Sequence, residues 1–223
     1  YKYKDYIFLL KMHHIIFMKN KRPQLIANNK TELCIEGYPR SSNSFFVRMF
    51  KSKNSNVNIA HHSHSIANIK FCLNKKIPVV CLIREPHKSI ASYCIYSNLK
   101  DLNYAISYYI HFYNFILKIK DEIVIAPFDV VVKDSNDILL MINQMYNTTF
   151  NQINHEIASK KVKNDIDDRY KMNKLSKFEE KRKPLPNLKR DSEKSLLEKK
   201  IKKHILYQKA LNLFNSITLN VKD

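Results

Sequence analysis

One short stretch of the chain combines the residue types that bind an anionic group. Gly37 is the only glycine among the 223 residues, and it stands where an apolar run gives way to Pro, Arg and small polar residues. The amphipathic run Phe45–Phe50 follows, and this order predicts a strand, a tight turn and a helix. Backbone N–H groups at the start of such a helix attract anions. The side chains of Arg40, Ser41, Asn43 and Ser44 would complete an anion-binding turn.

Two further polar clusters follow apolar runs of the chain. The cluster His61-His62-Ser63-His64 comes directly after Val57–Ala60, and Arg84 comes directly after Ile77–Ile83. An imidazole has an ordinary pKa of about 6.5, so it can act as a general base at neutral pH. A planar guanidinium suits bidentate contacts with oxyanions. These clusters are therefore candidates for proton transfer and for a second anion contact.

The elements that would position these residues alternate between strands and helices. The predicted strands are Leu33–Tyr38, Val57–Ala60, Ile77–Ile83 and Ile123–Phe128. The predicted helices are Phe45–Lys53, Ser65–Lys75, Ser89–Leu99, Leu102–Lys120 and Ser135–Tyr146, the last with Ser135 as its N-cap. This alternation predicts an α/β fold in three layers, with a central parallel sheet flanked by helices. Since ligands bind at the carboxyl ends of parallel strands, the three polar clusters are expected to converge on one site.

The length of the chain favours one domain over residues 1–223. Residues 1–30 are predicted to form an amphipathic arm, 31–150 a nucleotide-binding core, and 151–223 a basic C-terminal segment that ends in a helix over Ser192–Ile217. No run is long and apolar enough to span a bilayer. Residues 1–23 are a candidate for peripheral membrane contact.

Composition limits the class of protein and its partners. A hydrophobic content of 44% indicates a folded chain. The net charge of +19 is consistent with an anionic partner and equally with a solvated lysine-rich surface. The four cysteines lack a C-x-x-C spacing, so buried free thiols in a reducing, cytoplasmic compartment are expected; they are Cys34, Cys72, Cys81 and Cys94.

At this point the sequence resembles the sulfotransferases that use 3′-phosphoadenosine 5′-phosphosulfate (PAPS). Tyr38-Pro39-Arg40-Ser41-Ser42-Asn43-Ser44 resembles the family's first motif, Y-P-[KR]-S-G-[TN]-[TS]. Arg84-Glu85-Pro86, with Ser92 eight residues after Arg84, resembles the second. His62 and His64 lie 22 and 20 residues before Arg84, where the family places its catalytic histidine. The likeness covers about residues 31–150, and it includes the helical segment that follows the fourth strand in bacterial-type members.

The resemblance implies a P-loop-type fold and a role for each matching residue. Gly37, Pro39 and Ser42 would shape the turn, with Ser42 standing where the family has glycine. The 5′-phosphosulfate would be bound by Arg40, Ser41, Asn43 and Ser44, and the 3′-phosphate by Arg84 and Ser92. His64, or else His62, would take the proton of the acceptor, and no metal is implied. Lys189 and Arg190, with Lys183, are candidates to replace the glycine-rich element that some members use to hold the 3′-phosphate. The acceptor stays open between a carbohydrate, a lipid headgroup and a small alcohol.

Several alternatives stay open on the sequence alone. A P-loop nucleotide kinase would need the Lys and second Gly of G-x-x-x-x-G-K-[ST], which this turn does not have. A basic nucleic-acid-binding protein would fit the net charge, but the sequence has no recognisable nucleic-acid-binding motif. A sulfotransferase-like protein that binds nucleotide without turnover would fit the motifs. The histidines alternatively form an adventitious metal site. Eight aromatic residues belong either to the core or to an acceptor site: Tyr93, Tyr96, Tyr104, Tyr108, Tyr109, Phe112, Tyr113 and Phe115.

Overall fold

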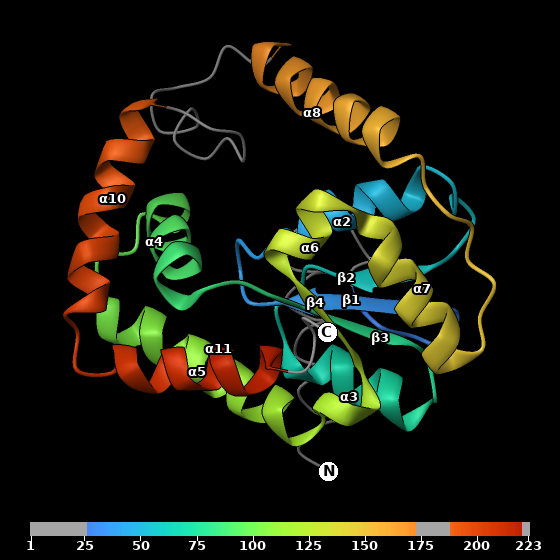
Figure 1. Cartoon of the computed structure of the whole chain (residues 1–223), viewed down its shortest axis with the longest axis horizontal. Helices are drawn as coiled ribbons and strands as arrows, with labels where there is room; N and C mark the ends of the chain where they lie inside the picture. The colour runs from blue at the N-terminus through green and yellow to red at the C-terminus, as the bar shows by residue number, and fades with distance from the viewer. Residues whose placement is uncertain (1–25, 173–187, 220–223) are drawn as a thin grey trace.

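A four-stranded sheet lies at the centre of the computed structural model, which describes residues 26–172 and 188–219 (Figure 1). Its strands are β1 (Leu33–Gly37), β2 (Ile59–His61), β3 (Val79–Ile83) and β4 (Val124–Pro127). All neighbouring strands are parallel, in the order β2-β1-β3-β4. Each strand overlaps one of the four predicted runs, although β2 begins two residues after the predicted Val57 and includes His61. The predicted α/β fold with a parallel sheet is confirmed.

Helices cover both faces of the sheet. Successive residues of a strand point to opposite faces, so each strand contributes side chains to two cores. Cys34 and Cys81 face one core, which is shared with α3 (Ile66–Asn74), α5 (Leu102–Lys118) and α11 (Tyr207–Thr218). Ile35, Val80 and Leu82 face the other core, which is shared with α2 (Asn43–Lys51) and α7 (Ser135–Tyr146). Figure 1 shows α2 above the sheet, α7 along its right-hand side, and α3, α5 and α11 below it. All four cysteines are buried free thiols, as predicted.

The strand order places a topological switch between β1 and β3. From β1 the chain passes outward to β2, and after α3 it returns past β1 to form β3. Loops that leave β1 and β3 therefore lead in opposite directions from neighbouring strand ends. In open parallel sheets this is the place where ligands bind.

Two helix boundaries near the site differ from the sequence-based expectation. The helix α4 covers Pro86–Ser97, so it begins three residues before the predicted Ser89, because proline suits the first turn of a helix. The N-cap of α7 is Asp134, whose carboxylate accepts from Asn136 N at 2.9 Å, and not Ser135. The Ser135 hydroxyl instead donates to Val131 O, in the preceding helix α6 (Phe128–Lys133), at 3.0 Å.

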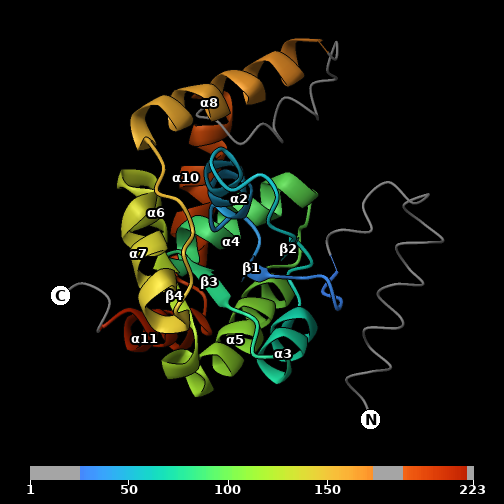
Figure 2. The same cartoon turned by 90° about the vertical axis from the view of Figure 1, so that its right-hand side faces the viewer.

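The C-terminal third holds more helix than the sequence indicated. The helix α8 (His155–Met172) was not predicted; it packs against α2, and its Ala158 and Val162 are buried in the core that α2 and α7 share. The prediction of a single helix over Ser192–Ile217 is wrong, because α10 (Leu188–Lys202) ends in a turn before α11. There, Lys203 N and His204 N donate to the carbonyls of Lys200 and Ile201 and so close the helix end. The turn lets α10 pack on α4 and α11 pack on α5 (Figure 2).

Parts of the expected outer segments lie outside the described residues. These parts are residues 1–25 of the predicted arm, including the candidate membrane contact over residues 1–23, together with residues 173–187 and 220–223. None of the helices in the described part of the chain combines the length and the hydropathy of a membrane span.

Gly37 is required by the close approach of two strands. It is the last residue of β1, and its φ is not positive. A Cβ built on it would lie 2.4 Å from Leu82 O in β3. We expect Gly37→Ala to lower the free energy of unfolding by about 3 kcal/mol, the upper range for overpacking. The melting temperature should then fall by roughly 10 °C for a chain of this size.

The matched control for this change is Ser195→Ala, which alters an exposed position on α10. Its melting temperature should stay close to that of the parent protein. Equal melting temperatures for Gly37→Ala and the parent would contradict the steric argument.

Candidate functional site

The turn between β1 and α2 has an unusual backbone conformation. Arg40 and Ser42 both adopt left-handed φ values, 69° and 70°. Asn43 Nδ2 braces the turn by donating to Tyr38 O at 3.2 Å, and the first helical bond runs from Phe46 N to Ser42 O at 3.0 Å. Ser42 thus takes the conformation that glycine usually supplies, at a cost of about 1 kcal/mol. The N–H groups that precede Phe46 have no partner within α2.

Arg40 and Arg84 lie together at the carboxyl ends of β1 and β3. Arg84 Nη1 donates to Arg40 O at 3.3 Å, and Arg40 Nε donates to Ser92 Oγ in α4 at 3.0 Å. The structure therefore brings the two predicted motifs into direct contact across the topological switch. Two arginines at neighbouring strand ends contribute a positive potential that attracts an anion.

Each guanidinium is oriented by an aromatic ring. Arg84 Cζ lies 3.9 Å from the centroid of the Phe128 ring, and Arg40 Cζ lies 5.0 Å from that of Tyr96. The Tyr109 hydroxyl donates to Arg84 O at 2.8 Å and fixes the backbone after β3. Both arginines keep partial exposure. A cation over the face of an aromatic ring is stabilised, so each ring favours the position of its guanidinium.

His64 is held at its backbone and at one ring nitrogen. Its Nδ1 lies 2.7 Å from Gly37 O, and its carbonyl accepts from the Tyr108 hydroxyl at 2.6 Å. Because a carbonyl oxygen can only accept, Nδ1 carries the hydrogen. In a neutral ring the lone pair is then on Nε2, for which no hydrogen bond with a described residue is found. His64 thus has the tautomer that a general base needs.

His62 has both ring nitrogens engaged. Its Nε2 lies 2.7 Å from Ser44 Oγ, and its Nδ1 contacts His61 Nδ1. The ring of His62 lies 5.9 Å from that of His64, centroid to centroid. Among the described residues, no group of three or more His, Cys, Asp or Glu side chains is arranged to hold a metal ion. Of these histidines, His64 has the geometry that best suits proton transfer.

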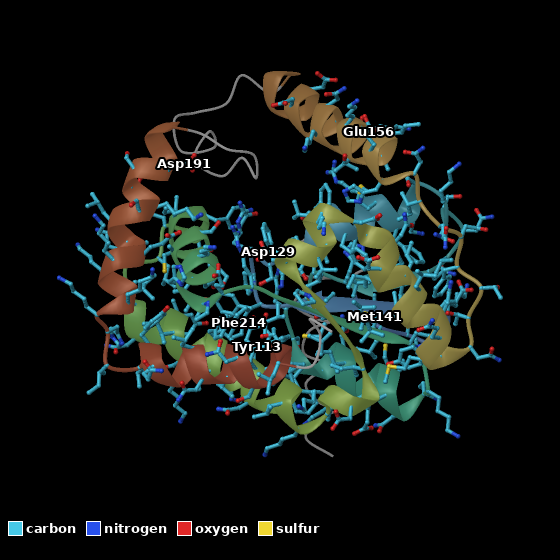
Figure 3. The ribbon with its side chains drawn as sticks, viewed as in Figure 1. Tyr113, Asp129, Met141, Glu156, Asp191 and Phe214 are labelled. Carbon is cyan, nitrogen blue, oxygen red and sulfur yellow. The ribbon has the colours of Figure 1, made fainter. Side chains whose placement is uncertain are left out.

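Two acidic residues at this edge of the sheet escaped the sequence analysis. Glu36 is fully buried in β1 and accepts hydrogen bonds from the histidine loop. Burial raises the pKa of its carboxyl group, and the nearby His64 is the largest opposing influence. The sequence signal that could have identified Glu36 is a charged residue inside the otherwise apolar run Leu33–Gly37. Asp129 is exposed in the first turn of α6, directly after β4 (Figure 3).

The aromatic residues divide between core and surface. Tyr109, Phe112 and Tyr113 are buried, and Tyr113, labelled in Figure 3, belongs to the core against which Phe214 of α11 packs. The Tyr113 hydroxyl donates to Leu82 O at 2.8 Å and accepts from Tyr38 N at 3.4 Å, so it ties β1 to β3. Tyr104 is 55% exposed, so a core position for this residue is wrong. The others are partly buried: Tyr93, Tyr96, Tyr108 and Phe115.

The remaining predicted site residues differ in accessibility. Pro39 is buried, and so is Ser41, whose hydroxyl has no well-formed hydrogen bond with a described residue although it lies near Tyr113. Ser42 Oγ donates to Ser41 O at 2.6 Å within the turn, and Ser44 is exposed. Lys189 and Arg190 belong to the first turn of α10, but their side chains lie outside the described residues.

Comparison with known proteins identifies no relative. No family model matches the chain, and neither a curated protein nor a solved structure matches it. The resemblance of the two motifs and the histidine to sulfotransferases thus stays a prediction. The function has to be argued from the site itself.

Proposed function

We propose that this chain is a PAPS-dependent sulfotransferase with a P-loop-type version of the α/β fold. The observation that carries the proposal is the contact between Arg40 and Arg84 at the switch between β1 and β3, together with the hydrogen bond of the His64 ring to Gly37 at the end of β1. Residues far apart in the sequence thereby bring two cations and a candidate base to the same strand ends. A ligand with two separate anionic groups matches this arrangement.

The residues present fit the donor in charge and in hydrogen-bonding type. PAPS would supply the sulfuryl group and a leaving phosphate, and it carries a further phosphate on its ribose. Arg40 and the N–H groups at the start of α2 would bind the phosphosulfate end. The buried Ser41 hydroxyl, which is a potential donor without a well-formed partner, supports an anion in the turn. Arg84 and Ser92 would bind the 3′-phosphate.

His64 would handle the proton of the acceptor. As the acceptor oxygen or nitrogen bonds to sulfur, its proton passes to His64 Nε2, and the bond from sulfur to the phosphate oxygen breaks in line. Arg40 counters the charge that develops on that phosphate oxygen. The Gly37 carbonyl holds the imidazole and the Tyr108 hydroxyl holds the His64 backbone during this step. The chemistry then requires positioning and charge stabilisation, with no covalent intermediate on the protein.

Calorimetry with 3′,5′-diphosphoadenosine and with ATP–Mg²⁺ tests the proposal directly. We expect the diphosphoadenosine to bind at least ten times more tightly, because it presents a phosphate to each arginine. Preference for ATP–Mg²⁺ would favour a nucleotide kinase instead. Equal, weak binding of both, with strong and steeply salt-dependent binding of nucleic acid, would favour a nucleic-acid-binding protein.

Removal of divalent metal provides a second test. We expect turnover of PAPS to be unchanged in EDTA, since guanidinium groups and backbone N–H groups would take the role that Mg²⁺ has in kinases. The measurement is the initial rate with and without chelator, followed by addition of excess Mg²⁺. A loss of rate in EDTA that Mg²⁺ restores would contradict this assignment.

A further inference from the structure

A buried carboxylate holds the loop that carries the candidate base. Glu36 is fully buried in β1, one residue before the strand ends. Its Oε1 accepts from Ser63 N (3.1 Å), Ser63 Oγ (2.6 Å) and Asn68 Nδ2 (2.9 Å), and its Oε2 accepts from His64 N (2.9 Å). Burying an isolated carboxylate would cost several kcal/mol, and a set of four donors offsets that cost. All four come from one short segment of the chain.

This segment has a backbone that needs external support. His62 and His64 both adopt left-handed φ values, 59° and 51°, which are rare for residues with a side chain. The two carboxylate oxygens of Glu36 bind the consecutive N–H groups of Ser63 and His64, and so fix the peptide between the two left-handed residues. Removing the acceptor would leave two N–H groups without their partner and release the strained backbone.

The same strand also fixes the imidazole. Glu36 binds the amide of His64, while the next residue, Gly37, accepts the hydrogen on Nδ1 of the ring. Two adjacent residues of β1 thus determine both the backbone and the tautomer of His64. The Glu36 carboxyl group and the imidazole of His64 are also close enough to interact electrostatically.

We propose that Glu36 is a positioning residue that keeps His64 in its Nδ1–H tautomer with Nε2 directed to the reacting group. The proposal rests on the proposed function only in calling His64 the base. Glu36 touches the loop and not the substrate, so its loss should act on the chemical step and spare nucleotide binding.

The test compares two carboxylates of the same part of the chain. Glu36→Gln keeps the shape but turns an amide N–H toward one of the two backbone donors. The matched control is Glu32→Gln, because Glu32 is exposed and binds Asn58 N at 2.8 Å before β2, at the opposite edge of the sheet. Long-range ¹H–¹⁵N spectra report the tautomer of His64, assigned by comparison with His64→Gln.

We expect the parent protein and Glu32→Gln to show His64 as the Nδ1–H tautomer. Glu36→Gln should show a mixture of both tautomers, a fall in kcat of about tenfold or more, and an affinity for 3′,5′-diphosphoadenosine within about twofold of the parent. Unchanged His64 signals in folded Glu36→Gln would overturn the proposal, even if stability fell.

If Glu36→Gln does not fold, Ser63→Ala removes one of the four donors and leaves the charge in place. A partial shift of the His64 tautomer in that variant would support the proposal, and unchanged signals would overturn it. Because the spectra need no turnover, the outcome is separate from that of the proposed function. A parent protein that binds no diphosphoadenosine would end the sulfotransferase proposal and leave the tautomer test intact.

Discussion

Replacement of His64 by alanine should abolish sulfuryl transfer and leave the affinity for 3′,5′-diphosphoadenosine nearly unchanged. A positioned general base contributes about 10²- to 10⁴-fold to a rate, so kcat should fall by at least a hundredfold. Nucleotide affinity should stay within about twofold, since Arg40 and Arg84, and not His64, would supply the phosphate contacts. Steady-state kinetics with PAPS and calorimetry with the product nucleotide measure the two effects separately.

Two other histidines serve as controls for this result. His111 is exposed on α5, so His111→Ala should keep full activity. His62→Ala removes the contact with Ser44 Oγ and should affect nucleotide affinity more than His64→Ala does. Full activity of His64→Ala together with an inactive His62→Ala would transfer the role of base to His62. His64→Gln, which can still donate to Gly37 O, tests the same role if the alanine variant does not fold.

Those parts of the fold that depend on apolar runs and chain order were predictable from the sequence. Ile77–Ile83 is apolar at every position except Pro78, as expected for a strand buried on both faces, and Val79–Ile83 became β3. Strands that alternate with helices indicated a parallel sheet, and a parallel sheet places its strand ends on one edge. The convergence of Arg40 and Arg84 follows from that topology and needed no side-chain information.

Features that depend on tertiary contacts were not predictable. Ser42 adopts the left-handed conformation because the surrounding turn is braced, and propensity alone disfavours it. A glutamate such as Glu36 is unfavourable in a buried apolar strand unless it has hydrogen-bond donors. Its donors Ser63 N and His64 N lie in a loop that is distant in the sequence. The turn that separates α10 from α11 contains neither Gly nor Pro, so only the packing of the two helices on α4 and α5 explains it.

Replacement of Arg84 by alanine should weaken the binding of 3′,5′-diphosphoadenosine far more than the binding of adenosine 5′-monophosphate. A hydrogen bond to a charged group contributes about 1.5–3 kcal/mol, which corresponds to a loss of roughly 10- to 150-fold. Adenosine 5′-monophosphate lacks the 3′-phosphate, so its affinity should fall by no more than about threefold. Calorimetry with both nucleotides, on the parent and on the variant, gives the difference.

The second nucleotide also separates the two ways in which Arg84 can act. Arg84 Nη1 binds Arg40 O, so its removal disturbs the turn as well as the proposed phosphate contact. Disturbance of the turn weakens both nucleotides equally, whereas loss of a 3′-phosphate contact weakens only one. Arg48→Ala, which removes the same charge from the last turn of α2, should leave both affinities close to those of the parent. Equal losses for both nucleotides in Arg84→Ala would remove the role assigned to Arg84 and, with it, the case for a site that recognises two phosphates.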